Sequence, residues 1–302
     1  MSEEHQKPAP PISKLIAFEK HSMPHWKLIL SYDGTAFHGW QVQPGLATIQ
    51  GTLAQTLHHL TGETVLPQGS GRTDAGVHAL GQVTSFSLEA TIPPDNLQRA
   101  LNRALPSSIR ILSAETVPET FHARHSATAK TYEYRIFQRR QIRVPPISRT
   151  WRSGFPQLPA ETTDRICPPF LAPFVWDCRW PLDPTPMQAA AELLLGAHDF
   201  TSFAAADPDL THRQNMVQQL TTKHLTLSTF HHENHQLIYR VSGSGFLHHM
   251  VRNIVGTLAE IGRGALTPDA IPHILKAKDR SAAGPTAPAS GLFLHTVHYD
   301  PK

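Results

Sequence analysis

Short apolar stretches with the pattern of β-strands alternate along this chain with longer stretches that have the pattern of α-helices. Residues 26–32 (WKLILSY) are strand-like, whereas the apolar side chains of residues 48–60 recur on one helical face behind a candidate N-cap, Thr48. The same two patterns predict strands at residues 78–88, 109–117, 219–227, 236–241 and 291–297, and helices at residues 93–101, 187–195, 246–261 and 268–276. Strands that alternate with helices indicate layers of sheet and helix around a common core.

Length and composition are those of a globular protein. The 302 residues, 40% of them hydrophobic and 17% charged, suffice for one large domain or two ordinary ones. We predict a poorly ordered tail at residues 1–25, a first half at residues 26–122 and a second half at residues 123–302. Residues 138–169, rich in Pro and Arg and without clear periodicity, are interpreted as a basic insertion in the second half. No apolar run is long enough to span a membrane, and the first residues have no secretion signal, so we expect no membrane partner.

Charge is unevenly distributed, although the net charge is only +3. Residues 124–152 contain eight Lys or Arg and one acid, Glu133. Such a stripe suits a phosphate backbone, and a solvated basic surface explains it equally well. The two cysteines, Cys167 and Cys178, form no C-x-x-C pair and no disulfide framework, which favours a reducing, cytoplasmic location.

The densest local signal is the stretch GSGRTDAGVHALGQV at residues 69–83, which has three glycines within its first eight residues. Glycines permit positive φ and the close approach of another backbone, so an acid and a base in such a loop are placed for a ligand. The glycines follow neither a Walker A loop nor a G-x-G-x-x-G pattern. Composition by itself favours a plainer interpretation, a hairpin turn in which Asp74 caps its own backbone.

GRTDAGVHA in this loop resembles the active-site loop of the TruA family of pseudouridine synthases. Six further blocks that resemble the same family stand in the family's order and span nearly the whole chain. They are SYDGTAFHGWQVQP (31–44), TIQGTL (48–53), FHARHSATAKTYEYRI (121–136), DFTSF (199–203), GFLHHMVRNIVGTL (245–258) and SGLFLHTVHY (290–299). Seven blocks in order are very specific, so we expect an isomerase of this type.

The resemblance implies roles for the residues at matching positions. Asp74 matches the catalytic aspartate, the nucleophile that acts near C1′ of the ribose, and Arg72 is expected to pair with its carboxylate. Tyr132 matches an aromatic residue that covers the flipped uracil and assists removal of the C5 proton. Arg252 matches a further basic residue of the substrate site. Tyr134 is predicted to lie on the opposite face of the strand from Tyr132 and to join the core.

Binding roles are also considered for two residues near the first strand and for the adjacent histidines. His38 and Trp40, in the block at 31–44, are predicted RNA contacts, with core packing of Trp40 as an equal alternative. The 20 histidines include adjacent pairs such as His248 and His249. Because neighbours on a helix do not share a face, we do not expect such pairs to bind zinc.

The resemblance also implies the fold and the substrate. The expected fold is α+β, with two pseudo-symmetric halves, each an antiparallel sheet backed by helices, around a central basic cleft that holds Asp74. The expected protein is a homodimer that isomerises uridines 38, 39 and 40 in the anticodon stem-loop of tRNA. The isomerisation transfers no electrons and adds no group, so neither a cofactor nor a metal is expected.

Two classes compete with this prediction. A non-catalytic RNA-binding protein has the basic stripe but no need of Arg72, Thr73 and Asp74 between glycines. A carboxylate-dependent hydrolase normally needs a second catalytic acid or metal ligands, and no second acid lies in a comparably constrained loop.

Overall fold

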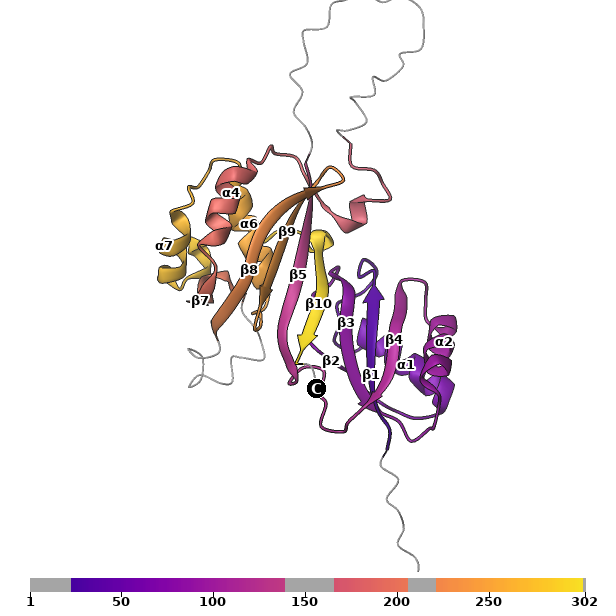
Figure 1. Cartoon of the computed structure of the whole chain (residues 1–302). Helices are drawn as coiled ribbons and strands as arrows, with labels where there is room; N and C mark the ends of the chain where they lie inside the picture. Colours follow the sequence, from indigo (N-terminus) through magenta and orange to yellow (C-terminus); the bar gives the residue numbers. More distant parts are fainter. Residues whose placement is uncertain (1–22, 139–165, 206–220, 301–302) are drawn as a thin grey trace, which may run out of the picture.

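One ten-stranded sheet runs through the molecule and joins both halves of the chain (Figure 1). The structure, a computed structural model, describes residues 23–138, 166–205 and 221–300. The strands are β1 (His25–Tyr32), β2 (Gln68–Gly69), β3 (His78–Ser87), β4 (Ile109–Val117), β5 (Ala127–Gln138), β6 (Trp176–Cys178), β7 (Gly196–Asp199), β8 (Thr222–Glu233), β9 (Gln236–Gly243) and β10 (Leu292–Tyr299). Their order is β4-β1-β3-β10-β5-β9-β8-β7, with β2 beside β3 and β6 beside β5.

The helices gather in two groups, one for each part of the sheet. The α-helices are α1 (Ile49–Thr61), α2 (Pro94–Ala104), α4 (Pro184–Glu192), α6 (Met250–Gly262) and α7 (Ala270–Ala277). The 3₁₀ turns are η2 (Ala172–Phe174), η3 (Thr201–Phe203), η5 (Arg280–Ala282) and η6 (Ala289–Gly291). Figure 1 shows α1 and α2 beside β1 and β4, and α4, α6 and α7 beside β8 and β9. Among the described residues, none of these helices is long and apolar enough to cross a membrane.

Local patterns account for the first elements. Along β1 the buried side chains alternate, with Trp26, Leu28 and Leu30 at most 1% exposed, as expected of a strand with one face on a core. Thr48 caps α1 as predicted, because its side-chain oxygen accepts a hydrogen bond from Gly51 N.

The last strand of the chain joins the two halves. β10 pairs in parallel with β3, through Phe293 with His78 and Leu294 with Ala79, and antiparallel with β5 on its other side. Figure 1 shows yellow β10 between purple β3 and magenta β5. The α+β prediction is therefore confirmed at the level of class, and the two expected antiparallel sheets are parts of a single mostly antiparallel one. The pseudo-symmetry of the halves stays a prediction.

One predicted boundary is wrong in a way that matters for the site. The sequence pattern begins a helix at residue 246, but α6 begins at Met250. His249 precedes it with φ 57°, a left-handed conformation that no helical residue adopts. Residues 246–249 therefore form a turn at the N-terminus of α6. The predictions for residues 1–22, for residues 139–165 of the basic insertion and for residues 219–220 fall outside the described residues.

Candidate active site

The loop between β2 and β3 carries Asp74 and is held from one side by residues that follow β1. The Trp40 backbone N–H donates to the carbonyl oxygen of Thr73 at 3.0 Å, and the Thr73 and Tyr32 hydroxyls lie 2.8 Å apart. Gly39 lies against the same backbone with φ +85°, and a Cβ there would come within 2.6 Å of Thr73 O. Only glycine fits this approach, so the backbone on both sides of Asp74 is positioned by a close contact.

A buried glutamine and a lysine hold the start of the loop. The Gln82 side chain accepts a hydrogen bond from the Ser70 hydroxyl at 2.6 Å and donates one to Gly71 O at 2.9 Å. Lys130, on β5, donates from Nζ to Ser70 O at 2.6 Å. Burial, with Arg124 and Lys223 adding to it, lowers the pKa of Lys130 to about 8. Gln82, for which no role was predicted, and Lys130, predicted only as part of the basic stripe, both brace the loop.

The carboxylate of Asp74 is paired with a guanidinium from the other half of the chain. Arg252, in the first turn of α6, donates from Nη1 to Asp74 Oδ2 at 3.0 Å and from Nε to the carbonyl oxygen of Ala287 at 2.8 Å. Arg72, which the resemblance implies as a partner of this carboxylate, lies exposed in the same loop, and its pairing with Asp74 stays a prediction. Asp74 also does not act as the cap of a simple turn, since its carboxylate faces Arg252.

Two histidines complete the surroundings of this carboxylate. Nε2 of His249 lies 3.2 Å from Asp74 Oδ2, and Nε2 of His248 lies 3.6 Å from Oδ1. The two imidazole rings are 4.1 Å apart between centroids. The premise that these adjacent histidines stand on a helix and face apart does not hold, because both precede Met250, the first residue of α6.

Asp74, His248 and His249 could together offer ligands to a metal ion, since one ligand atom of each lies within 4.8 Å of the others. The guanidinium of Arg252 on the same carboxylate, however, repels a cation. We therefore interpret Asp74, His248 and His249 as a polar cluster and not as a metal centre. The absence of a metal from the reaction stays a prediction.

Tyr132 lies close to this cluster on β5. Its side chain is 8% exposed and packs edge-to-face on Phe246, with 4.9 Å between ring centroids. Burial raises the pKa of the Tyr132 hydroxyl well above its ordinary value, and the nearby Tyr32 and the charge of Asp74 raise it further. The hydroxyl is therefore neutral in the physiological range, so a tyrosinate is unfavourable as a proton acceptor. The ring remains as a surface on which a nucleobase can stack.

Tyr134 is fully buried, as predicted, but for a different reason. Residues two apart on a strand share a face, so it lies on the same face as Tyr132, and the electrostatic influence of Arg252 reaches it there. Its hydroxyl donates to the carbonyl oxygen of Pro288 at 2.8 Å. Depth in the core, not the opposite face, removes it from the candidate site.

The two predicted RNA contacts of the first half differ from each other. The Trp40 side chain is 3% exposed and packs against Gly69, which favours the alternative of core packing. His38 is exposed, so its predicted role in RNA contact is still open.

The predicted basic stripe divides between two faces of the sheet. Because side chains alternate along β5, Lys130 lies on the face of Tyr132, whereas Arg135 and Glu133 lie on the other. There Glu133 is buried and pairs with Arg135 at 2.8 Å and with Arg240 at 2.6 Å. Arg135 therefore serves an internal ion pair, and the arginines between residues 139 and 152 lie outside the described part of the chain.

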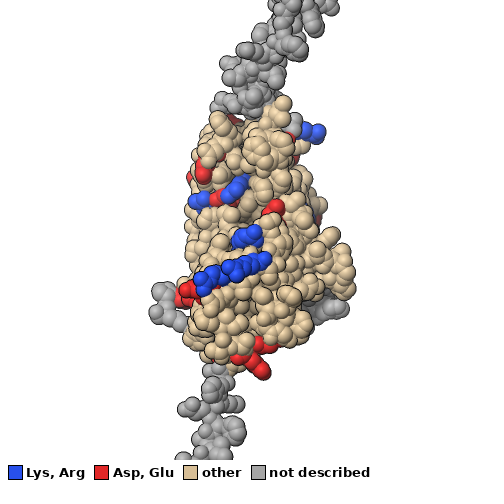
Figure 2. Space-filling view, turned by 90° about the vertical axis from the view of Figure 1, so that its right-hand side faces the viewer, with Lys and Arg blue, Asp and Glu red and all other residues tan. Residues whose placement is uncertain are grey.

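Charge on the surface is patchy where it can be seen. Figure 2 looks at the side that lies to the right in Figure 1, formed by α2 and β4, and shows a short band of Lys and Arg with acidic side chains nearby. This side is not a continuous basic surface. The expected basic cleft around Asp74 stays a prediction.

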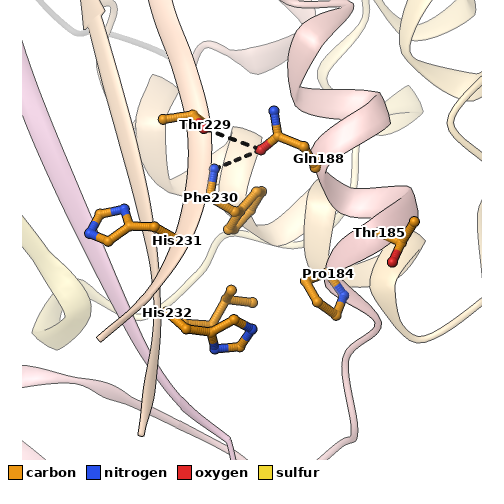
Figure 3. A pocket seen from close by; sticks show the side chains of 8 residues that line it. Pro184, Thr185, Gln188, Thr229, Phe230, His231 and His232 are labelled. Atoms are coloured by element: carbon orange, nitrogen blue, oxygen red, sulfur yellow. Dashed lines mark hydrogen bonds between the residues drawn. The ribbon is translucent and has the colours of Figure 1, made fainter. Parts of the chain in front are cut away.

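A separate cavity of about 250 Å³ lies between α4 and the edge of β8 (Figure 3). β7 pairs only with the first part of β8, and the Gln188 side chain accepts a hydrogen bond from Phe230 N at 2.8 Å further along the strand. Gln188 thus takes the place of a neighbouring strand at this edge. Because the cavity has no acid–base pair, we interpret it as a packing feature.

Comparisons with known proteins identify the family of this chain. The sequence profile of the family described as tRNA pseudouridine synthase matches residues 28–126 and 190–300. Proteins named tRNA pseudouridine synthase A from Solibacter usitatus and Moorella thermoacetica are 46% and 44% identical, over 90% and 92% of this chain and 98% and 100% of their own. A relative of the same name from a Geobacillus species is 39% identical over 91% of this chain and 98% of its own. The chain belongs to the tRNA pseudouridine synthase family.

Proposed function

We propose that this protein converts uridine to pseudouridine in tRNA, at positions 38, 39 and 40 of the anticodon stem-loop. The observation that carries the proposal is the partly exposed carboxylate of Asp74, held on a braced loop against Arg252 and beside the ring of Tyr132. The family and the names of the relatives support tRNA as the substrate. The choice of positions rests on the resemblance of the seven sequence blocks.

The reaction follows from these groups. The target uridine leaves the stack, which costs a few kcal/mol of unstacking, and Arg72 at the loop fills the space that the base leaves. Asp74 acts near C1′ as the N1–C1′ bond breaks, either by attack on C1′ or by assisting proton removal at C2′. The uracil turns on the surface of Tyr132 and a C5–C1′ bond forms, while the bond from Asp74 to C1′ breaks or the proton taken from C2′ returns there. The C5 proton is then lost and N1 gains one, so atoms and electrons balance without a cofactor or metal.

Docking of the tRNA uses cations around the loop. Arg124 and Lys223 lie near enough to Lys130 to influence its pKa, and all three are candidates for phosphate contacts. We further propose a cytoplasmic homodimer in which residues 138–169 supply additional contacts to the phosphate backbone of the tRNA. Phosphate contacts give affinity without sequence choice, so they position the stem and leave selection to the site.

The test is incubation of the protein with unmodified tRNA, with a chelator and no cofactor. Pseudouridine has the mass of uridine, so digested nucleosides must be separated by chromatography. The wild type should convert uridines, tRNAs with cytidine at positions 38–40 should not react, and Asp74→Asn should give no product while still binding tRNA. Asp95→Asn, at an exposed acid of α2, is the matched control and should behave as wild type.

The competing classes predict other results. Cleaved RNA indicates a hydrolase, and bound but unchanged RNA indicates a binding protein. Substantial turnover by Asp74→Asn would remove Asp74 from the mechanism.

A further inference from the structure

The turn before α6 contains an unusual backbone conformation next to the catalytic carboxylate. His249 is one of four residues other than glycine with positive φ in the described part of the chain, at φ 57° and ψ 3°. This region costs most residues roughly 1–2 kcal/mol, and histidine tolerates it better than most. His249 occupies the N-cap position of α6, yet its side chain makes no cap hydrogen bond. The conformation therefore serves something other than helix capping.

What the conformation achieves is the placement of the imidazole. Nε2 of His249 lies 3.2 Å from Asp74 Oδ2. The same oxygen accepts a hydrogen bond from Nη1 of Arg252 at 3.0 Å. Two donors can thus converge on one carboxylate oxygen. The ring of His248 lies against that of His249, with 4.1 Å between centroids, and limits its rotation.

A proton on Nε2 of His249 suits this contact better than a proton on Nδ1. A neutral imidazole has one N–H and one lone pair, and a lone pair directed at a carboxylate is repelled. The structure therefore favours the tautomer that donates from Nε2 to Asp74. Contacts of this kind in the free enzyme tighten when the substrate binds.

We propose that His249 is a positioning residue for the isomerisation: its Nε2–H and Arg252 together hold Asp74 Oδ2, so that Oδ1 is directed at the ribose of the flipped uridine. This inference rests on the proposed function and adds to it a residue that acts through Asp74. It explains why a strained histidine stands where α6 could have begun with an ordinary cap.

The proposal has a consequence for pH dependence. The charged and titratable groups that face His249 in the described structure are Asp74, His248, Arg252 and Arg280. Burial lowers the pKa of His249 below its ordinary value, Asp74 opposes the shift, and His248 and the two arginines reinforce it. Protonation adds a full positive charge beside Oδ2 and makes the carboxylate a weaker nucleophile. The rate should therefore fall as the pH drops through the pKa of His249.

Three variants of one position test the proposal. His249→Ala removes the donor and should lower kcat roughly 10- to 100-fold, about 1.4 to 2.7 kcal/mol at 1.36 kcal/mol per tenfold, with KM for tRNA changed less than about threefold. His249→Gln keeps an N–H at a similar distance and should recover most of kcat, but cannot be protonated, so the fall in rate at low pH that His249 causes should disappear. His249→Gly relieves the left-handed backbone, so it should keep the melting temperature and still lose kcat.

The matched control is His235→Gln. His235 also has a left-handed backbone, at φ 65°, but is exposed in the turn between β8 and β9, so this variant should leave kcat and its pH profile unchanged. A wild-type protein without pseudouridine synthesis contradicts the proposed function itself. With an active wild type, the inference alone is overturned if His249→Ala keeps full kcat, if Gln restores no more than Ala, or if kcat falls only in proportion to stability.

Discussion

Replacement of Arg252 by Gln tests the ion pair with Asp74 that only the structure shows. The resemblance implies Arg72 as a partner of Asp74, and the structure shows an ion pair of Asp74 with Arg252. Glutamine keeps part of the length and one N–H donor group but removes the charge. We expect Arg252→Gln to lower kcat strongly and to leave the KM for tRNA nearly unchanged.

The magnitude follows from the geometry. Two unit charges 3.0 Å apart attract by about 5 kcal/mol at an effective dielectric constant of 20. Both side chains are partly exposed, Arg252 by 15% and Asp74 by 22%, and the histidines remain as donors. The pair fixes the carboxylate in place but also reduces its nucleophilicity, so its loss should cost less than the full attraction, about 2 to 3 kcal/mol, or about 30- to 150-fold in kcat.

The assay is single-turnover conversion of a saturating tRNA, which separates chemistry from product release. Arg263→Gln is the control at the other end of the same helix, where Arg263 forms an exposed pair with Glu260 worth about 0–1 kcal/mol. A rate for Arg252→Gln within about threefold of wild type would refute the pairing as a source of catalysis.

Three more changes test other parts of the site. Tyr132→Ala should weaken both tRNA binding and turnover, because it removes the ring on which the uracil turns, and the wild-type rate should not rise between about pH 8 and 10, because the raised pKa of Tyr132 keeps its hydroxyl neutral there. Gly39→Ala places a Cβ 2.6 Å from Thr73 O and should impair both melting temperature and kcat, whereas Gly45→Ala, with similar positive φ and open space, should lower only stability, by about 1 kcal/mol. The pKa of Lys130 is lowered from 10.5 in the unfolded chain to about 8 in the folded protein, so between pH 8 and 10.5 the unfolded chain binds more protons. The free energy of unfolding should therefore rise with pH across this range. Thermal unfolding of the wild type and of Lys130→Met at several pH values measures the difference.

Much of the fold was predictable because its signals are local. The alternation of buried side chains in β1 and the capping of α1 by Thr48 are properties of a few neighbouring residues, and both predictions are confirmed. The start of α6 was misplaced because an apolar helical pattern continues through residues 246–249, and nothing in that pattern shows that His249 takes a left-handed conformation. A pattern reports which face is apolar, not where the backbone leaves the helix.

The sequence by itself determined the family, through seven blocks in order, and the loop that carries Asp74, the proposed catalytic acid. Only the tertiary structure decided what surrounds that acid. Arg252 is 178 residues from Asp74, and it meets the carboxylate because β10 joins the two halves into one sheet. The sequence contains several cations that could pair with Asp74, among them Arg72 two residues before it. It does not show which of them lie close to the carboxylate in the folded protein. The choice is made by the distances that folding imposes, since an ion pair forms between groups that packing brings within reach and not between groups that are near in sequence.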